Sequence, residues 1–161
     1  MECFVGLGGN QGNVIENFAF ALRSVEKRFN SCVASRIYRT SPVSAIEQPH
    51  FLNACCRFEC FLSPFELLSA LGEIEKEAGK VPKRRDEPRP LDLDLLFYGE
   101  EVLFSQGLVL PHPRWHERLF VIAPLADLGK LPFGLDASLF LEHFVNRNNE
   151  SVELYEESFC R

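Results

Sequence analysis

The first half of the chain alternates hydrophobic and polar positions in a way that predicts strands and helices in turn. Residues 4–7 form a short apolar run that ends at two glycines, which is typical of a strand. Apolar residues then recur at helical spacing over 14–25, and Asn13 just before them is a suitable N-cap. A second strand is predicted over 31–40, and it must end before Pro42 because proline cannot donate to a β-ladder.

Residues 51–62 repeat at period two, which predicts a further strand. The even-numbered positions are all apolar and predict a core-facing side. The odd-numbered positions include asparagine, arginine and glutamate, and they predict a face that carries polar groups. Ser63 and Glu66 then form a capping box around Pro64, which predicts the start of a helix that ends at Gly79.

Strict alternation returns over 91–98 and predicts another strand. Its two predicted faces carry Leu91, Leu93, Leu95 and Phe97 on one side, and Asp92, Asp94, Leu96 and Tyr98 on the other. A turn at Gly99 predicts a hairpin from this strand into residues 102–104. Helices are predicted over 117–128 and 137–144, followed by an acidic and frayed tail or linker remnant over 145–161.

The predicted order β-α-β-β-α-β matches an α+β ferredoxin-like sandwich, with a largely antiparallel sheet and helices packed on it. A doubly wound parallel sheet would need a more regular alternation of strands and helices. The chain has 161 residues, of which 46% are hydrophobic and 25% charged. This size and balance predict one globular domain over residues 1–161.

Charge and cysteine content narrow the function classes. The net charge of −6 argues against nonspecific nucleic-acid binding, which needs a basic surface. No apolar run approaches the ~18 residues of a membrane span, and the N-terminus does not resemble a signal peptide. The six cysteines show no CxxC pair and no metal-ligand spacing. We therefore expect buried free thiols in a cytoplasmic protein that binds neither nucleic acid nor membrane.

The strongest candidate for chemistry is the pair Asp92 and Asp94. Carboxylates at i and i+2 project from the same face of a strand, about 6.5–7 Å apart at Cα. Taken alone, such a pair is more often a solvated strand face, but it also suits Mg²⁺, which takes carboxylate and phosphate oxygens. A cationic loop before the pair favours a polyphosphate site. Its cations are Lys80, Lys83, Arg84, Arg85 and Arg89.

Three weaker features accompany the acidic pair. Phe51 and Asn53 lie on the predicted polar face of their strand, where an aromatic ring beside an amide suits a flat ligand rich in heteroatoms. His112 lies between two prolines, and with Arg114 and Arg118 it is a candidate donor to a phosphate, although a lone histidine is more often structural. The glycines of residues 6–12 follow GxGxxxG, which predicts a tight turn and not a dinucleotide fingerprint.

Together these stretches resemble the 6-hydroxymethyl-7,8-dihydropterin pyrophosphokinase family. The motifs that match are GLGGNQGN at 6–13, YRTSPV at 38–43, QPHFLNA at 48–54, RPLDLDLLFYG at 89–99 and LPHPRWHERLFVIAPL at 110–125. They cover most of the chain in the order of the family. The resemblance implies transfer of a pyrophosphoryl group from ATP to the hydroxymethyl oxygen of the pterin in folate biosynthesis, with release of AMP.

The resemblance also implies site residues, cofactor and partners. Asp92 and Asp94 would hold two Mg²⁺ ions, and Arg89 and Lys80 would join them in catalysis. ATP would contact Glu75, Lys80, Arg85, Arg89, Leu95, His112 and Arg118. The pterin would contact Thr40, Ser41, Val43, Phe51, Asn53, Asp92 and Phe120. Dihydropteroate synthase is implied as a fusion partner or a neighbouring enzyme.

The loop before the acidic pair departs from the family pattern. Lys80 stands where the family has an arginine, Pro82 occupies another arginine position, and the loop tryptophan is absent. A lysine is a point charge without the bidentate fork of arginine. The alternatives are therefore a catalytically silent module that binds pterin and nucleotide, or another Mg²⁺-dependent nucleotidyl or phosphoryl transferase. No side chain stands out as a general base.

Overall fold

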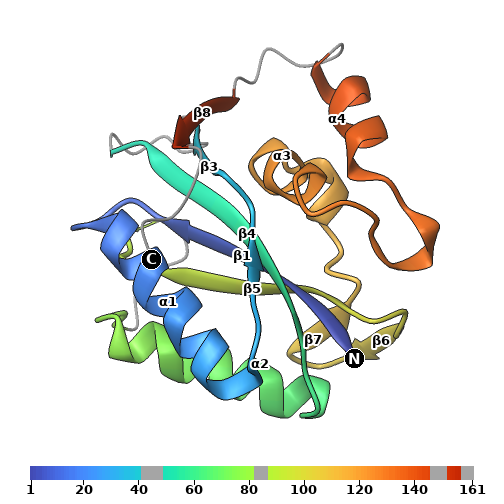
Figure 1. Cartoon of the computed structure of the whole chain (residues 1–161), viewed down its shortest axis with the longest axis horizontal. Helices are drawn as coiled ribbons and strands as arrows, with labels where there is room; N and C mark the ends of the chain where they lie inside the picture. The colour runs from blue at the N-terminus through green and yellow to red at the C-terminus, as the bar shows by residue number, and fades with distance from the viewer. Residues whose placement is uncertain (41–48, 82–86, 146–151, 157–161) are drawn as a thin grey trace.

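The computed structural model describes residues 1–40, 49–81, 87–145 and 152–156. Its main sheet has six strands, in which β5, β1, β4, β3 and β8 are neighbours in that order and β2 pairs with β4 (Figure 1). All of these pairings are antiparallel. The strands are β1 (Glu2–Gly9), β2 (Val33–Ala34), β3 (Ile37–Thr40), β4 (Phe51–Glu59), β5 (Asp92–Tyr98) and β8 (Val152–Glu156).

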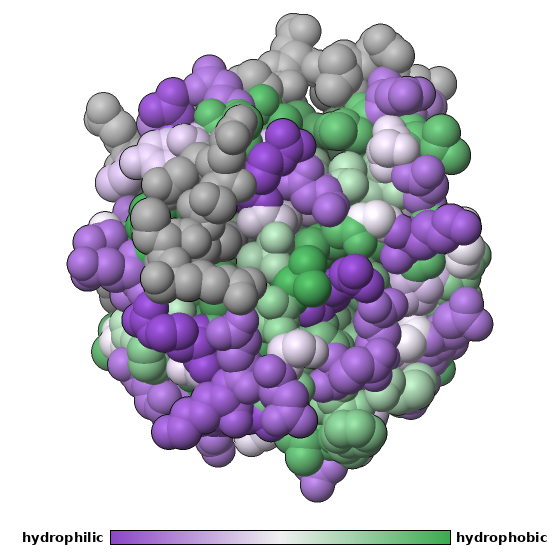
Figure 2. Space-filling view, viewed as in Figure 1, coloured by the Kyte–Doolittle hydropathy of each residue, from purple (hydrophilic) through white to green (hydrophobic). Residues whose placement is uncertain are grey.

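Helices lie on both faces of this sheet (Figure 1). One face is covered by α1 (Val14–Phe29) and α2 (Pro64–Glu77), whose outer surface is polar at the lower left of Figure 2. The other face is covered by α3 (Leu119–Ala126), with α4 (Ala137–Val145) packed against it. The order β1-α1-β3-β4-α2-β5 confirms the predicted ferredoxin-like α+β sandwich.

The predicted helix starts are confirmed at both long helices. Asn13 is the N-cap of α1, and its side chain accepts a hydrogen bond from the Glu16 N–H at 3.2 Å. At α2 the Ser63 side chain accepts from the Glu66 N–H, and the Glu66 carboxylate accepts from the Ser63 N–H at 2.8 Å. Each cap satisfies donors that the first helical turn leaves unpaired, so the side chains define where each helix begins.

The sheet is buried on both faces, which corrects the prediction that one face of β4 would mainly carry polar groups. Cys56 packs in the cluster under α1 and α2, whereas its neighbour Cys55 packs in a second cluster with Phe4 and residues of α3. Adjacent side chains point to opposite faces of a strand. The cover over Cys55 comes from α3, whose Val121 lies 66 residues further along the chain, so the local pattern could not predict it.

A bulge in β5 corrects the predicted faces of its last residues. Leu95 pairs with Val5 and Phe97 pairs with Phe4, so one extra residue of β5 stands opposite two consecutive residues of β1. Phe97 consequently packs with Leu96 in the second cluster, and Tyr98 packs in the first. Asp92 and Asp94 precede the bulge and keep their predicted face.

Three other predicted elements differ in the structure. The predicted strand over 31–40 is divided into β2 and β3, because the Ser35 side chain accepts the Cys55 N–H at 2.9 Å between them. The predicted hairpin from β5 is wrong, since β6 (Leu103–Ser105) pairs with β7 (Leu108–Leu110) as a separate small sheet. The tail is not frayed throughout, because β8 pairs with β3.

Helix α3 and helix α4 confirm the two predicted C-terminal helices, and short 3₁₀ turns at Trp115–Glu117 and Pro132–Gly134 precede them. The five cysteines in the described ranges are buried and free, as predicted, and Cys160 lies outside those ranges. In the part of the chain that the structure describes, no helix is long and apolar enough to cross a membrane.

Candidate active site

Two glycines of β1 leave an open strip on the face of the sheet toward α3. Gly8 pairs with Asn53 of β4 on one side and with Asp92 of β5 on the other. Gly6 lies two residues earlier and pairs with Asp94 in the same way. Among the described residues, a Cβ atom on Gly8 would meet only the Asn53 Oδ1, at 3.5 Å. Gly8 therefore leaves space between the Asn53 amide and the Asp92 carboxylate, whereas the Leu96 side chain would lie 3.6 Å from a Cβ atom on Gly6. We call Gly6 and Gly8, with the space above Gly8, the glycine strip.

The loop after β1 holds the main chain of Arg89. The Arg89 carbonyl accepts the N–H groups of Asn10 and Gln11 at 3.0 and 3.2 Å, and the Arg89 N–H donates to Asn10 Oδ1 at 3.0 Å. A Cβ atom on Gly9 would lie 2.6 Å from the Pro90 carbonyl oxygen, so only glycine allows this approach. The GLGGNQGN motif thus positions Arg89 beside the acidic pair.

Cations from two segments surround Asp92. The Lys80 Nζ lies 2.6 Å from Asp92 Oδ1, and the Arg89 Nε lies 3.3 Å from Asp92 Oδ2. Glu75 of α2 also binds the Lys80 Nζ, at 2.7 Å, and the same Glu75 oxygen accepts the Leu93 N–H of β5. Burial opposes the charge of Lys80, but its contacts with Asp92 and Glu75 outweigh this and raise its pKa.

Asp94 has a different environment from Asp92. Its nearest described cation is Arg118, whose Nη1 lies 3.7 Å from Asp94 Oδ2. Burial raises the pKa of Asp94, and the charge of Asp92 raises it further, whereas His112, Arg118 and Arg89 lower it. Two carboxylates are therefore held on one strand face with their mutual repulsion only partly compensated.

His112 faces this group from the segment after β7. Its backbone N–H donates to the Leu96 carbonyl of β5 at 2.8 Å. Its ring nitrogen Nδ1 accepts the backbone N–H of Arg114 at 3.2 Å. This leaves Nε2 as the ring nitrogen that carries the proton in the neutral form. Burial lowers the pKa of His112, although Asp94 acts in the opposite direction.

Two half-buried aromatic rings lie next to the cations. The guanidinium of Arg89 lies 5.9 Å from the ring centre of Phe51, and that of Arg118 lies 5.6 Å from the ring centre of Phe120. These are cation–π distances. Phe120 packs against the second cluster, and Phe51 lies on the face of β4 that carries Cys55. The rings therefore come from α3 and from the sheet beneath it.

A buried polar pair completes the group on the β4 side. The Asn53 amide donates to Thr40 Oγ1 at 2.9 Å, and only 4% of Asn53 and 8% of Thr40 is exposed. Gly8 leaves the Asn53 Oδ1 accessible from the glycine strip. The pair presents an oriented amide beside an aromatic ring, which suits the edge of a flat polar heterocycle.

A cavity of about 610 Å³ opens beside Lys80 and Arg89, between the start of α1 and the end of α2. Polar side chains of α1 line its far wall, including Glu16 and Asn17. The cavity therefore borders two of the cations that lie next to Asp92, Lys80 and Arg89.

The structure brings most of the predicted site residues together around the glycine strip. Leu95 is an exception, because its side chain is buried in the first cluster, on the other face of β5. Three predicted residues lie outside the described ranges: Ser41, Val43 and Arg85. Sequence reasoning missed Asn10, although its motif was available, because the bond to Arg89 joins segments 79 residues apart.

The chain is similar to proteins of one family. A family model described as 7,8-dihydro-6-hydroxymethylpterin-pyrophosphokinase matches residues 4–130. A 2-amino-4-hydroxy-6-hydroxymethyldihydropteridine pyrophosphokinase of Haemophilus influenzae is 37% identical, and the match covers 80% of this chain and 81% of that protein. A mitochondrial folate synthesis bifunctional protein of Arabidopsis thaliana is 49% identical over 79% of this chain.

The chain spans about a quarter of the length of the bifunctional relatives, with 23% of the Arabidopsis protein covered. Among solved structures, a Plasmodium falciparum HPPK-DHPS with pterin and p-hydroxybenzoate has a similar fold, with a TM-score of 0.74 and 14% identity. That match covers 91% of this chain and 44% of the Plasmodium chain.

Proposed function

The chain belongs to the 7,8-dihydro-6-hydroxymethylpterin-pyrophosphokinase family, and from this premise we propose that it transfers a pyrophosphoryl group from ATP to 6-hydroxymethyl-7,8-dihydropterin. The products are AMP and the pterin diphosphate, which place the reaction in folate biosynthesis. The observation that carries the proposal is the register of three strands. Gly8 separates Asn53, a buried amide, from Asp92, a carboxylate held by two cations.

In this proposal the pterin lies on the glycine strip with its polar edge toward β4. The Asn53 amide and the Thr40 hydroxyl read that edge, and Phe51 and Phe120 contact the two faces of the ring. Ser41 and Val43 would contribute from the segment after β3. The support is chemical, because a pterin is a flat ring with donors and acceptors on one edge and needs oriented polar partners on an apolar support.

The nucleotide lies on the β5 side in this proposal. Arg89, Lys80, His112 and Arg118 supply charge and N–H donors to the phosphates, and Arg85 would join them from the loop. Glu75 acts indirectly, since it holds Lys80 and the β5 main chain. Preorganised cations around a transferring phosphoryl group stabilise the charge that spreads over its oxygens.

The donor set of Asp92 and Asp94 fits Mg²⁺. Both carboxylates offer hard oxygens on one strand face. Burial and then the charge of Asp92 raise the pKa of Asp94, and a divalent cation would relieve the repulsion between the two carboxylates. Within the described ranges no group of three or more His, Cys, Asp or Glu side chains is arranged to hold a metal ion. Two aspartates leave room for phosphate oxygens and water, as Mg²⁺ requires. When bound, Mg²⁺ neutralises phosphate charge and orients the ATP, and we assign two ions to this pair.

The residues of the chain then act by orientation and charge. The pterin hydroxyl attacks the β-phosphorus in line, the new O–P bond forms, and the bond to the oxygen bridging the α- and β-phosphates breaks with AMP as the leaving group. Asn53 and the two rings fix the direction of the hydroxyl, and Arg89 and Lys80 balance the negative charge. The hydroxyl proton leaves to solvent or through Asp94.

The Lys80 variation keeps one other function open, a silent module that binds pterin and nucleotide without turnover. We favour the enzyme, because Lys80 lies against Asp92 and so holds a cation beside the acidic pair. We also propose dihydropteroate synthase as fusion partner or neighbouring enzyme, since the plant relatives are bifunctional. A cytoplasmic location is proposed from the buried thiols.

The test is a product assay with purified protein, ATP, Mg²⁺ and 6-hydroxymethyl-7,8-dihydropterin. We expect AMP to appear in a one-to-one ratio with a pyrophosphorylated pterin. ADP or free pyrophosphate as the nucleotide-derived product would indicate a different transferase. Binding of the pterin with a nonhydrolysable ATP analogue, without any turnover of ATP, would indicate the silent module.

A further inference from the structure

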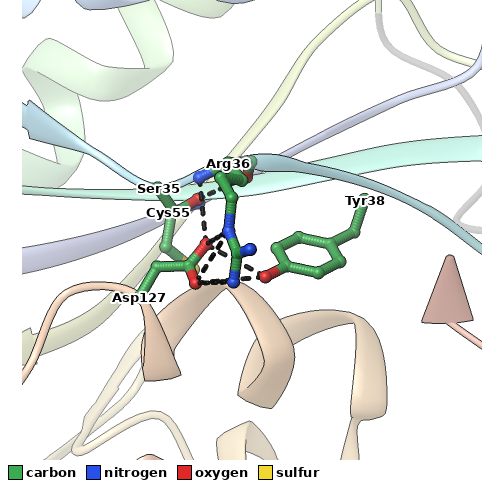
Figure 3. A network of polar contacts seen from close by, with 5 residues as sticks. All are labelled: Ser35, Arg36, Tyr38, Cys55 and Asp127. Carbon is green, nitrogen blue, oxygen red and sulfur yellow. Dashed lines mark hydrogen bonds and ion pairs between the residues drawn. The ribbon is translucent and has the colours of Figure 1, made fainter. Parts of the chain in front are cut away.

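Helix α3 is tied to the sheet by one carboxylate at its C-terminal end (Figure 3). Asp127 accepts the Arg36 Nε and Nη2 donors at 3.1 and 2.6 Å, the Arg36 backbone N–H at 3.0 Å and the Tyr38 hydroxyl at 3.0 Å. A guanidinium that binds both oxygens of a carboxylate is directional as well as strong. We call Asp127, Arg36 and Tyr38 the Asp127 clamp.

The sheet side of the clamp is itself held in place. Ser35 is 4% exposed, and its hydroxyl accepts the Cys55 N–H at 2.9 Å and donates to the Arg36 carbonyl at 2.7 Å. These bonds stand between β2 and β3, where the ladder is interrupted. The interruption leaves the Arg36 N–H available for Asp127, as Figure 3 shows.

The helix side of the clamp is short and apolar. Helix α3 has eight residues, which at 1.5 Å per residue is about 12 Å, and six of the eight are buried. Apolar contacts are not directional, so they allow small shifts of the helix along the sheet. The hydrogen bonds of Asp127 fix its C-terminal end. Phe120 is at the other end, one turn or less from Arg118, and it moves with the helix.

Both sides of the clamp lead to the proposed pterin site. Tyr38 pairs with Asn53 in the register of β3 and β4, and two residues further Thr40 accepts the Asn53 amide. On the helix side, Phe120 is in the first turn of α3. The clamp therefore connects the strand that orients the Asn53 amide with the helix that carries Phe120.

We propose that Asp127 is a positioning residue for the pterin site, and that its clamp sets the separation between Phe120 on α3 and Asn53 on the sheet. This inference rests on the proposed function, since it takes Phe120 and Asn53 as pterin contacts. In that function Lys80, Arg89, His112 and the acidic pair hold the nucleotide from other segments, and Arg118 is its one proposed contact next to α3. Loss of the clamp therefore weakens the pterin far more than the nucleotide.

The experiment measures two affinities for Asp127→Ala and the wild type. One is for a nonhydrolysable ATP analogue with Mg²⁺, and the other is for 6-hydroxymethyl-7,8-dihydropterin in the presence of that analogue. We expect Asp127→Ala to weaken the pterin at least tenfold and the analogue by less than threefold. Tyr38→Phe removes only the hydroxyl bond, and we expect about a threefold loss of pterin affinity from it.

The matched control is Glu73→Ala, which removes an exposed carboxylate bound to Arg28 at 3.0 Å on the opposite face of the sheet. It should leave both affinities unchanged. Folding is checked by the fluorescence of the single tryptophan, Trp115, which packs 5.1 Å from Phe97 in the cluster under α3. If Asp127→Ala does not fold, Asp127→Asn and Tyr38→Phe carry the same comparison.

The outcomes separate the two proposals. A wild type that binds no pterin overturns the proposed function and this inference with it. A wild type that binds pterin, with variants that lose both ligands equally or keep full pterin affinity, overturns only the positioning role. A loss confined to the pterin supports it.

Discussion

The Lys80 Nζ lies 2.6 Å from Asp92 Oδ1, so the chain's own cation binds an oxygen of the proposed metal ligand. Glu75 holds the same ammonium at 2.7 Å from the other side. A divalent ion and Lys80 would compete for this oxygen, because both are attracted to the same charge. If Asp92 binds a metal ion, Lys80 can keep its ion pair with Glu75.

We therefore expect two opposite effects from Lys80→Ala. The affinity for Mg²⁺ without nucleotide should rise severalfold in calorimetry, because Asp92 loses its competing cation. The single-turnover rate at saturating ATP and pterin should fall about 100-fold, because a charge beside the transferring group is lost. Lys80→Arg serves as the control and should restore most of the rate. A rate equal to the wild type would move the catalytic role to Arg84 or Arg85.

Asp94→Asn should stabilise the fold while it abolishes turnover. A carboxyl whose pKa is raised by folding contributes stability below its unfolded pKa of about 3.9, and this stability is lost as the pH rises through the folded pKa. The side chain is 43% exposed, so we expect a gain at pH 7 of a few tenths to about 1 kcal/mol in urea unfolding. The gain should disappear near pH 3.

The control for this prediction is Asp92→Asn, which removes a carboxylate paired with Lys80 and Arg89. It should destabilise the protein at pH 7, although it also abolishes turnover. Equal stability changes in both variants would contradict our account of the two environments.

Asn10→Ala should weaken ATP binding indirectly, because Asn10 does not contact the phosphates in our proposal but holds the main chain of Arg89. The Asn10 side chain accepts the Arg89 N–H and donates to the Pro49 carbonyl at 3.1 Å, and the residue is 5% exposed. We expect a loss of about 1–3 kcal/mol of stability and a higher KM for ATP. Ser63→Ala removes a helix cap of α2 at about 1 kcal/mol and should leave this KM unchanged. If both variants raise the KM equally, Asn10 acts only through stability.

Gly8→Ala should block the pterin without disturbing the fold. Within the described part of the chain the added methyl group has only the Asn53 Oδ1 within 4 Å, at an ordinary contact distance, so we expect a stability change within about 0.5 kcal/mol. The methyl group would stand on the glycine strip, and titration should show pterin affinity at least tenfold weaker. Gly72→Ala in α2 adds a methyl group to open space and should stabilise the helix by about 1 kcal/mol at unchanged pterin affinity. Full pterin affinity in Gly8→Ala would move the ring away from the strip.

Tyr38→Phe should make the protein less sensitive to alkaline pH. Burial, with help from the charge of Asp127, raises the pKa of Tyr38 to about 12. Its contribution to stability is present below the unfolded pKa of about 10 and is lost as the pH rises toward 12. The wild type should therefore lose on the order of 1–2 kcal/mol more than the variant over this window, as measured by denaturant unfolding at each pH. Parallel pH curves would contradict the burial of the hydroxyl.

Period-two reasoning predicted the faces that build the site. Phe51, Asn53, Asp92 and Asp94 share the side of the sheet that the alternation assigned to them, because each lies within a regular stretch of strand. The same reasoning failed at Phe97 and Tyr98. A bulge adds one residue without any change in composition, so nothing local marks it.

Local sequence patterns also could not predict the contacts between distant segments. Arg36 and Asp127 are 91 residues apart, and Arg89 and Asn10 are 79 apart. Each is an ordinary polar residue in its own segment, and only the packing of α3 and the turn after β1 brings the partners together. The cover of α3 over β4 likewise depends on the tertiary fold.

Two adjacent buried cysteines, Cys55 and Cys56, allow the opening of each helical layer to be measured separately. Cys55 is 1% exposed beneath α3, and Cys56 is 1% exposed on the other face, toward α1 and α2. Burial raises the pKa of Cys55, so an alkylating reagent reacts with it only after α3 lifts from the sheet. The labelling rate at Cys55 then measures how often α3 separates from the sheet. The labelling rate at Cys56 independently measures how often α1 and α2 separate from the other face.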